Sequence, residues 1–109
     1  MKTFTIANTT WTMSDHIIER MEEREFDELD IKCALMYGKS FASVEDKDAT
    51  LTIFVIDEAD YEGQMTNYGT RATHFILVHK KNKFGAGREL LTGYYADCNC
   101  LKVRYNMGK

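Results

Sequence analysis

The apolar residues of this chain change their spacing at Lys39. Between Ser14 and Tyr37 they recur every three or four residues, the period of an α-helix, whereas from Ser40 onward they alternate with polar residues, as in β-strands. A chain that places helices before a run of strands is typical of the α+β class. We therefore predict an α+β fold in which two N-terminal helices pack on a small antiparallel β-sheet.

Both helices carry start signals. Ser14 is a good N-cap residue, and Asp15 follows it in the first turn, where a carboxylate interacts favourably with the positive end of the helix dipole. The first helix is predicted over residues 14–24. Asp27, with Asp30 three residues later, is an acidic variant of the capping box and marks the start of another helix.

The second helix is predicted over residues 28–37, because Gly38 is a natural residue to follow a helix C-terminus. Its apolar residues fall on two sides, with Ile31 on one and Leu29 on the other. Such a helix is expected to be sandwiched, here between the first helix and the sheet. Cys33 lies within it and is predicted to belong to the core.

Extended segments are predicted before and after the helix pair. They span residues 3–7, 40–45, 51–57, 73–79, 89–96 and 101–105. Asn8, Thr9 and Thr10 are predicted to form a turn. Residues 58–72 are predicted to form a long loop, and residues 80–88 a basic loop between two strands.

A length of 109 residues fits one domain, residues 1–109. No apolar run approaches the roughly 20 residues that cross a bilayer, and the N-terminus alternates instead of forming a signal-peptide block. We expect a soluble, cytoplasmic protein without membrane contact. The three cysteines, Cys33, Cys98 and Cys100, and the three histidines are not spaced as zinc ligands, so no metal or cofactor is expected.

Charge is divided unequally along the chain. Residues 1–62 hold 15 acidic and 6 basic side chains, whereas residues 63–109 hold 2 acidic and 8 basic ones. A fold that separates these halves carries an acidic and a basic face. The two faces are either solvated surfaces or sites for a protein partner and an anionic ligand.

The helix pair also carries a pattern of charged residues. His16, Arg20 and Arg24 stand four residues apart and form one row along the first helix. With the second helix and Gly38, this row resembles the opening of a widespread, mostly uncharacterised bacterial and phage family. The resemblance extends to the strands at residues 75–78 and 90–94, within a span of about residues 12–96.

That family is grouped with RelE-like, ParE-like and BrnT-like toxins, many of which cut RNA without a metal. The resemblance implies a metal-independent ribonuclease or RNA-binding domain of this toxin type. Cleavage of this kind needs a base, an acid and cations at the scissile phosphate. His16 would be the base or acid, and Arg20 and Arg24 would hold the phosphate. Arg88 and Tyr94 would support them from the sheet.

Structural roles are open for the same row. Arg20 can pair with Glu23, Arg24 can pair with Asp27 or Glu28, and His16 can bond a backbone group near the helix start. Surface ion pairs of this kind contribute about 0–1 kcal/mol to stability.

The predicted basic loop holds four cations: Lys80, Lys81, Lys83 and Arg88. They could bind phosphates, with Phe84 stacking on a base, although lysine-rich hairpin loops often serve only solubility. His74 and His79 lie on opposite faces of one predicted strand, so at most one of them faces the helix row.

An acidic pI of about 5.6 argues against a nuclease, because phosphate contacts supply most of the affinity of such proteins for RNA. The alternative is a non-catalytic phage or mobile-element protein that binds a basic protein surface through its acidic half. Either protein could have a protein partner, an antitoxin or a host factor. The sequence does not predict the oligomeric state.

Overall fold

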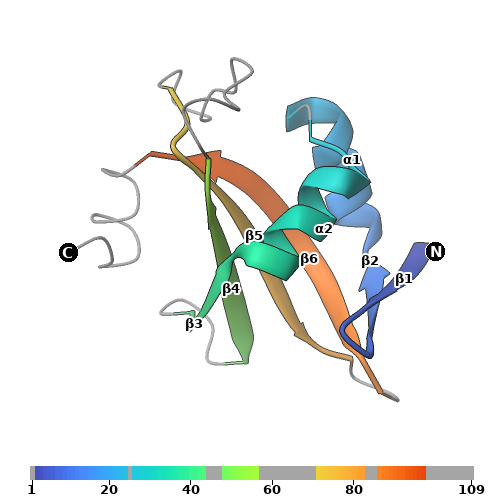
Figure 1. The fold of residues 1–109 in the computed structure, drawn as a ribbon. Helices are drawn as coiled ribbons and strands as arrows, with labels where there is room; N and C mark the ends of the chain where they lie inside the picture. The colour runs from blue at the N-terminus through green and yellow to red at the C-terminus, as the bar shows by residue number, and fades with distance from the viewer. Residues whose placement is uncertain (1, 25, 44–47, 57–70, 83–85, 98–109) are drawn as a thin grey trace.

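The computed structural model of this chain describes residues 2–24, 26–43, 48–56, 71–82 and 86–97 (Figure 1). These described residues form two helices and a six-stranded sheet, so the predicted α+β class is confirmed. The elements are β1 (Lys2–Ile6), β2 (Thr9–Met13), α1 (Asp15–Arg24), α2 (Glu28–Tyr37), β3 (Lys39–Ala42), β4 (Ala49–Val55), β5 (His74–Lys81) and β6 (Arg88–Ala96).

The sheet is mixed, so the predicted small antiparallel sheet is wrong. Its order is β1-β2-β6-β5-β4-β3, and β2 pairs with β6 in parallel while every other neighbouring pair is antiparallel. Thr9 and Thr10 belong to β2, although we predicted them to be turn residues. The turn between β1 and β2 consists of Ala7 and Asn8, with φ values of 50° and 64°. Two central residues with positive φ are typical of a type I′ hairpin turn.

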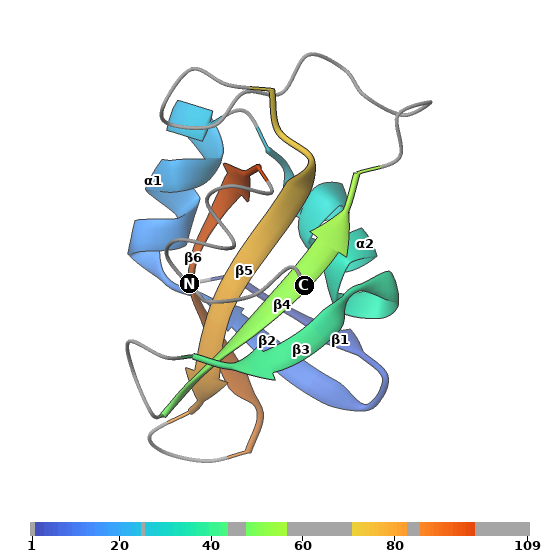
Figure 2. The same ribbon diagram turned by 90° about the vertical axis from the view of Figure 1, so that its left-hand side faces the viewer.

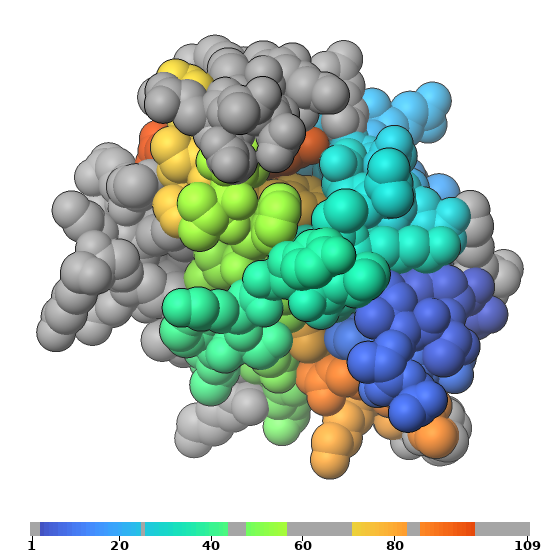
Figure 3. Space-filling model, viewed as in Figure 1, coloured from blue at the N-terminus to red at the C-terminus, as the bar shows by residue number. Residues whose placement is uncertain are grey.

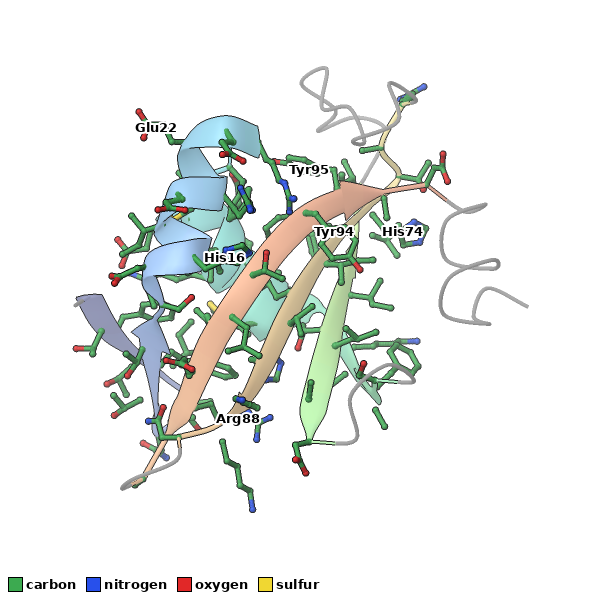
Figure 4. All side chains as sticks on the ribbon, turned by 180° about the vertical axis from the view of Figure 1, so that it is seen from behind. His16, Glu22, His74, Arg88, Tyr94 and Tyr95 are labelled. Atoms are coloured by element: carbon green, nitrogen blue, oxygen red, sulfur yellow. The ribbon has the colours of Figure 1, made fainter. Side chains whose placement is uncertain are left out.

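Helix α1 starts as its sequence predicts and is fixed to β6. The Ile17 backbone N–H donates to Ser14 Oγ at 3.1 Å, which is the N-cap bond. Ser14 also donates to β6, through its backbone N–H to the Leu90 carbonyl oxygen and through Oγ to that of Leu91. The helix therefore follows β2 directly and lies alongside β6 (Figure 4).

Helix α2 has the predicted capping box. The Asp30 backbone N–H donates to Asp27 Oδ1 at 2.9 Å, and the Asp27 backbone N–H donates to Asp30 Oδ2 at 3.0 Å. Gly38 ends the helix in an extended conformation, with a φ of −78°. The chain therefore does not need a glycine here to form a left-handed helix cap. A Cβ at Gly38 would lie 2.5 Å from the Ala34 carbonyl oxygen, so the glycine allows a close approach of backbones.

The main core lies between the helices and one face of the sheet. Ile17 of α1 and Ile31 of α2 pack in one buried cluster with Phe75 and Leu77 of β5. A second cluster, centred on Ile76, occupies the opposite face of the sheet. Figure 2 shows α2 beside β4, with β3 at the edge of the sheet.

One prediction about α2 is wrong. Ile31 and Ala34 are buried, but the other side of the helix is not covered by α1, because α1 lies alongside β6 instead. Leu29 is 67% exposed, and Cys33 is half-buried and outside the core cluster.

The remaining strands form close to their predicted positions. Strand β3 begins at Lys39, and β5 and β6 extend one or two residues beyond the predicted segments, so Lys80, Lys81 and Arg88 belong to strands and not to a loop. Lys83, most of the predicted loop over residues 58–72 and the predicted strand over residues 101–105 lie outside the described residues. Neither described helix is long and apolar enough to cross a membrane.

Candidate functional site

The predicted row on α1 lies beside the sheet. Arg24 donates from Nη1 to the Gly93 carbonyl oxygen of β6 at 2.8 Å, so this guanidinium holds the end of the helix against the strand. Arg20 forms an ion pair with Glu23, the structural role that its spacing allowed. Its Nε is buried and has no acceptor among the described residues. Both arginines therefore have structural contacts within the fold.

His16, at the start of this row, is exposed and makes no hydrogen bond or ion pair with another described residue. Figure 4 shows it beside β6, with Arg88 at the far end of the same strand. Gly93, whose carbonyl oxygen Arg24 contacts, lies five positions after Arg88, which corresponds to roughly 16 Å along a strand.

Tyr94 lies on the other face of the sheet. Its register partner is Ile76, and both belong to the cluster opposite the helices, whereas the neighbouring Tyr95 points into the helix-side core. The structure therefore does not bring His16, Arg88 and Tyr94 together. The five residues predicted for catalysis do not form one site.

Arg88 instead belongs to a chain of polar side chains on the helix-side face of the sheet. Its Nε donates to His79 Nδ1 at 2.9 Å, and its Nη2 donates to Thr50 Oγ1 at 3.1 Å. His79 Nε2 lies 2.7 Å from Thr52 Oγ1, which lies 3.0 Å from Ser40 Oγ. Because the guanidinium always donates, His79 Nδ1 accepts and its Nε2 carries the proton that is donated to Thr52.

His79 is 3% exposed and is held in its neutral form. Burial, followed by the charge of Arg88, lowers the pKa of His79 from 6.5 to about 4. The ring of Trp11 packs edge-on against the imidazole, with 4.9 Å between ring centroids. A neutral imidazole beside a cation is a poor base, so His79 positions Arg88 and is not itself suited to proton transfer.

The charge of Arg88 is not neutralised within the described residues. Both of its hydrogen-bond acceptors are uncharged, and none of the ion pairs found there includes it. Lys81 is its direct partner across β5 and β6, so both side chains leave the same face of the sheet. Lys80 points to the opposite face, where Glu89 is its partner. We call Arg88, Lys81, His79 and Thr50 the Arg88 site.

Gly87 sets the position of this site at the start of β6. Its φ is +95°, and a Cβ there would lie 2.4 Å from the Thr10 carbonyl oxygen of β2. Only glycine fits this conformation and this approach without strain. The backbone therefore enters β6 at a fixed place, immediately before Arg88.

Comparison with models of known protein families, with curated proteins and with solved structures finds no match. The resemblance to RelE-like, ParE-like and BrnT-like toxins therefore stays a prediction from the sequence pattern. Within the described part of the chain, no group of three or more His, Cys, Asp or Glu side chains is placed to hold a metal ion.

Sequence reasoning identified Arg88 and Lys81 but not what holds the guanidinium in place. Thr50 and Thr52 alternate along β4, and His79 of β5 is the register partner of Thr50, which places all three on one face once the strands are paired. That alternation was visible in the sequence, but the register that joins the strands was not.

Proposed function

We propose that this chain binds RNA, with the Arg88 guanidinium as the fixed contact for a backbone phosphate. The observation that carries this proposal is the charge of Arg88, which no described residue neutralises and which the two uncharged acceptors His79 and Thr50 hold in place. A guanidinium positioned in advance loses little side-chain freedom when it binds a phosphate. Neither of these hydrogen bonds uses Nη1, so its two hydrogens can donate to phosphate oxygens.

The position of Lys81 supports an anionic ligand. Directly opposed residues of antiparallel strands have Cβ atoms about 5 Å apart, and like charges in such a pair destabilise the sheet. The Lys81–Arg88 pair therefore carries a cost in the free chain that a bridging phosphate removes. The resemblance of the helix pair to RNA-cutting families favours RNA as the source of that phosphate.

The proposal is restricted to binding because the residues predicted for cleavage are separated. His16 lies on α1 beside β6, whereas Arg88 lies at the far end of that strand. Tyr94 is on the face of the sheet opposite the helices. We expect single-stranded RNA to remain intact after prolonged incubation with the protein. Cleavage that is lost in His16→Ala would contradict this restriction.

Binding is tested by fluorescence anisotropy with a labelled single-stranded RNA of mixed sequence at low salt. Loss of a charged hydrogen bond of about 1.5–3 kcal/mol predicts that Arg88→Gln weakens binding roughly 10- to 100-fold. Arg88→Lys keeps the charge but loses the planar guanidinium that His79 and Thr50 hold in place, so its RNA affinity should lie between those of the wild type and Arg88→Gln.

Lys39→Gln is the matched control, because Lys39 is exposed on β3 and the substitution removes the same charge. It should weaken RNA binding less than twofold. Equal effects of Arg88→Gln and Lys39→Gln would show a diffuse charge effect and contradict the proposal. So would a wild-type protein that does not bind the RNA.

A further inference from the structure

The outer side of α2 is apolar where a surface helix is usually polar. Leu29 and Met36 are 67% and 57% exposed, and Cys33 lies between them at the i+4 position. These three residues, which we call the α2 stripe, follow one line along the side opposite the buried Ile31 and Ala34. Charged residues normally occupy that side of a surface helix. Figure 3 shows α2 at the surface, in the middle of the face in view.

The border of the α2 stripe is acidic. Asp27 is exposed at the N-cap, and Glu28 and Asp30 follow in the first turn. The single cation of the helix is Lys32, whose Nζ lies 3.8 Å from Glu28 and 5.4 Å from the ring centroid of Phe4, so it is directed toward β1. The surface therefore combines apolar anchors with a net negative rim.

These two features define the chemistry of an occupant. Leu29 and Met36 are seven residues apart, or about 10 Å along the helix, which is two turns. A partner helix with an apolar seam matches this length, and the flexible Met36 side chain adapts to different seams. Cationic side chains beside the seam would face the carboxylates at the start of α2. A second copy of this chain matches this surface poorly, because its α2 carries Lys32 as its single cation to face the carboxylates.

We propose that the α2 stripe binds a cationic amphipathic helix of another protein. The apolar seam of that helix packs on Leu29, Cys33 and Met36, and its Lys or Arg side chains contact the carboxylates of Asp27 and Glu28. The α2 stripe shares no residue with the Arg88 site. Protein binding and RNA binding are therefore separable in the same molecule.

The test uses a labelled synthetic peptide of two leucine-lysine heptads whose leucines fall on one helical face. The control peptide has the same composition in an order that scatters the leucines. We expect the intact chain to bind the amphipathic peptide, by fluorescence anisotropy, at least tenfold more tightly than the control. Equal affinity for both peptides, or no binding of the amphipathic one, overturns the proposal.

The double variant Leu29→Ser/Met36→Ser locates the site and should weaken peptide binding at least tenfold. Val55→Ser is its matched control, because Val55 is a similarly exposed apolar residue on β4. It should leave peptide affinity unchanged, as should Arg88→Gln. Unchanged binding by the double variant overturns the proposal. Concentration-dependent self-association in sedimentation that the double variant abolishes would also overturn it, since the occupant would then be a second copy.

Discussion

Acidification is expected to destabilise this fold through His79. Burial and then the Arg88 charge lower the pKa of His79 to about 4 in the folded chain, against 6.5 for the ordinary side chain. Protonation therefore favours the unfolded state. The stability that neutral His79 provides is complete above pH 6.5 and is lost as the pH falls toward 4. One pKa unit corresponds to about 1.4 kcal/mol, so the whole loss is about 3 kcal/mol, of which about 2 kcal/mol falls between pH 7 and pH 5.

Urea unfolding followed by circular dichroism measures this loss. We would compare the wild type with His79→Gln, which removes the titrating group, and with His16→Gln, which removes an exposed histidine. Burial also lowers the pKa of His74, whose effect has the same sign and is common to all three proteins. Between pH 7 and pH 5, His79→Gln should lose about 2 kcal/mol less unfolding free energy than the wild type.

His16→Gln should follow the wild-type pH dependence. The reasoning is refuted if His79→Gln and the wild type lose the same free energy over this range. Such a result would mean that His79 is not held neutral by its burial and by Arg88.

Three further predictions concern local geometry, each measured as the free energy of urea unfolding at pH 7. Ala7→Asn should stabilise the protein by about 0.5–1 kcal/mol, because asparagine tolerates the positive φ of this turn better than alanine; a destabilised variant would contradict the type I′ assignment. Asp27→Ala removes half of the capping box with Asp30 and should cost about 1 kcal/mol, and no loss would show that the box contributes nothing. Gly87→Ala forces a Cβ toward Thr10 and should cost at least 1–3 kcal/mol while also weakening RNA binding; wild-type stability would exclude the close approach.

The sequence predicted the features that depend on near neighbours. The Ser14 cap and the Asp27–Asp30 box each involve residues three positions apart, so the helix starts could be placed before any tertiary contact was known. The period of two also located most strands. These signals are local, and the chain contains all the groups that form them in one short segment.

The features that were missed depend on distant pairing. Strand β2 contains three threonines and follows a turn, so it lacks a strong apolar alternation. It pairs along its whole length with β1 across the Ala7–Asn8 turn, and β6, more than 70 residues away, adds a parallel pairing from Trp11–Arg88 to Met13–Leu90. The exposure of Leu29 has the same origin, because α1 docks beside β6 and leaves that side of α2 uncovered.

The sequence predicted only part of the candidate site, because the rest depends on contacts between distant segments. Arg88 and Lys81 were recognisable as cations near a hairpin, but the contact between Arg88 and His79 requires the register of β5 on β6. His16, Arg20 and Arg24 lie on one helix, as their spacing of four residues predicted. Its Arg24 bond to the Gly93 carbonyl oxygen could not be anticipated, because no side-chain pattern reports a backbone acceptor.

The salt dependence of RNA binding tests the phosphate contact at Arg88 most directly. Each phosphate neutralised on a single strand adds about 0.7 to the magnitude of the negative slope of log K against log salt concentration. We expect Arg88→Gln to reduce the magnitude of that slope by about 0.7. Lys39→Gln should leave the slope at the wild-type value. A slope in Arg88→Gln equal to that of the wild type would show that Arg88 does not contact a phosphate.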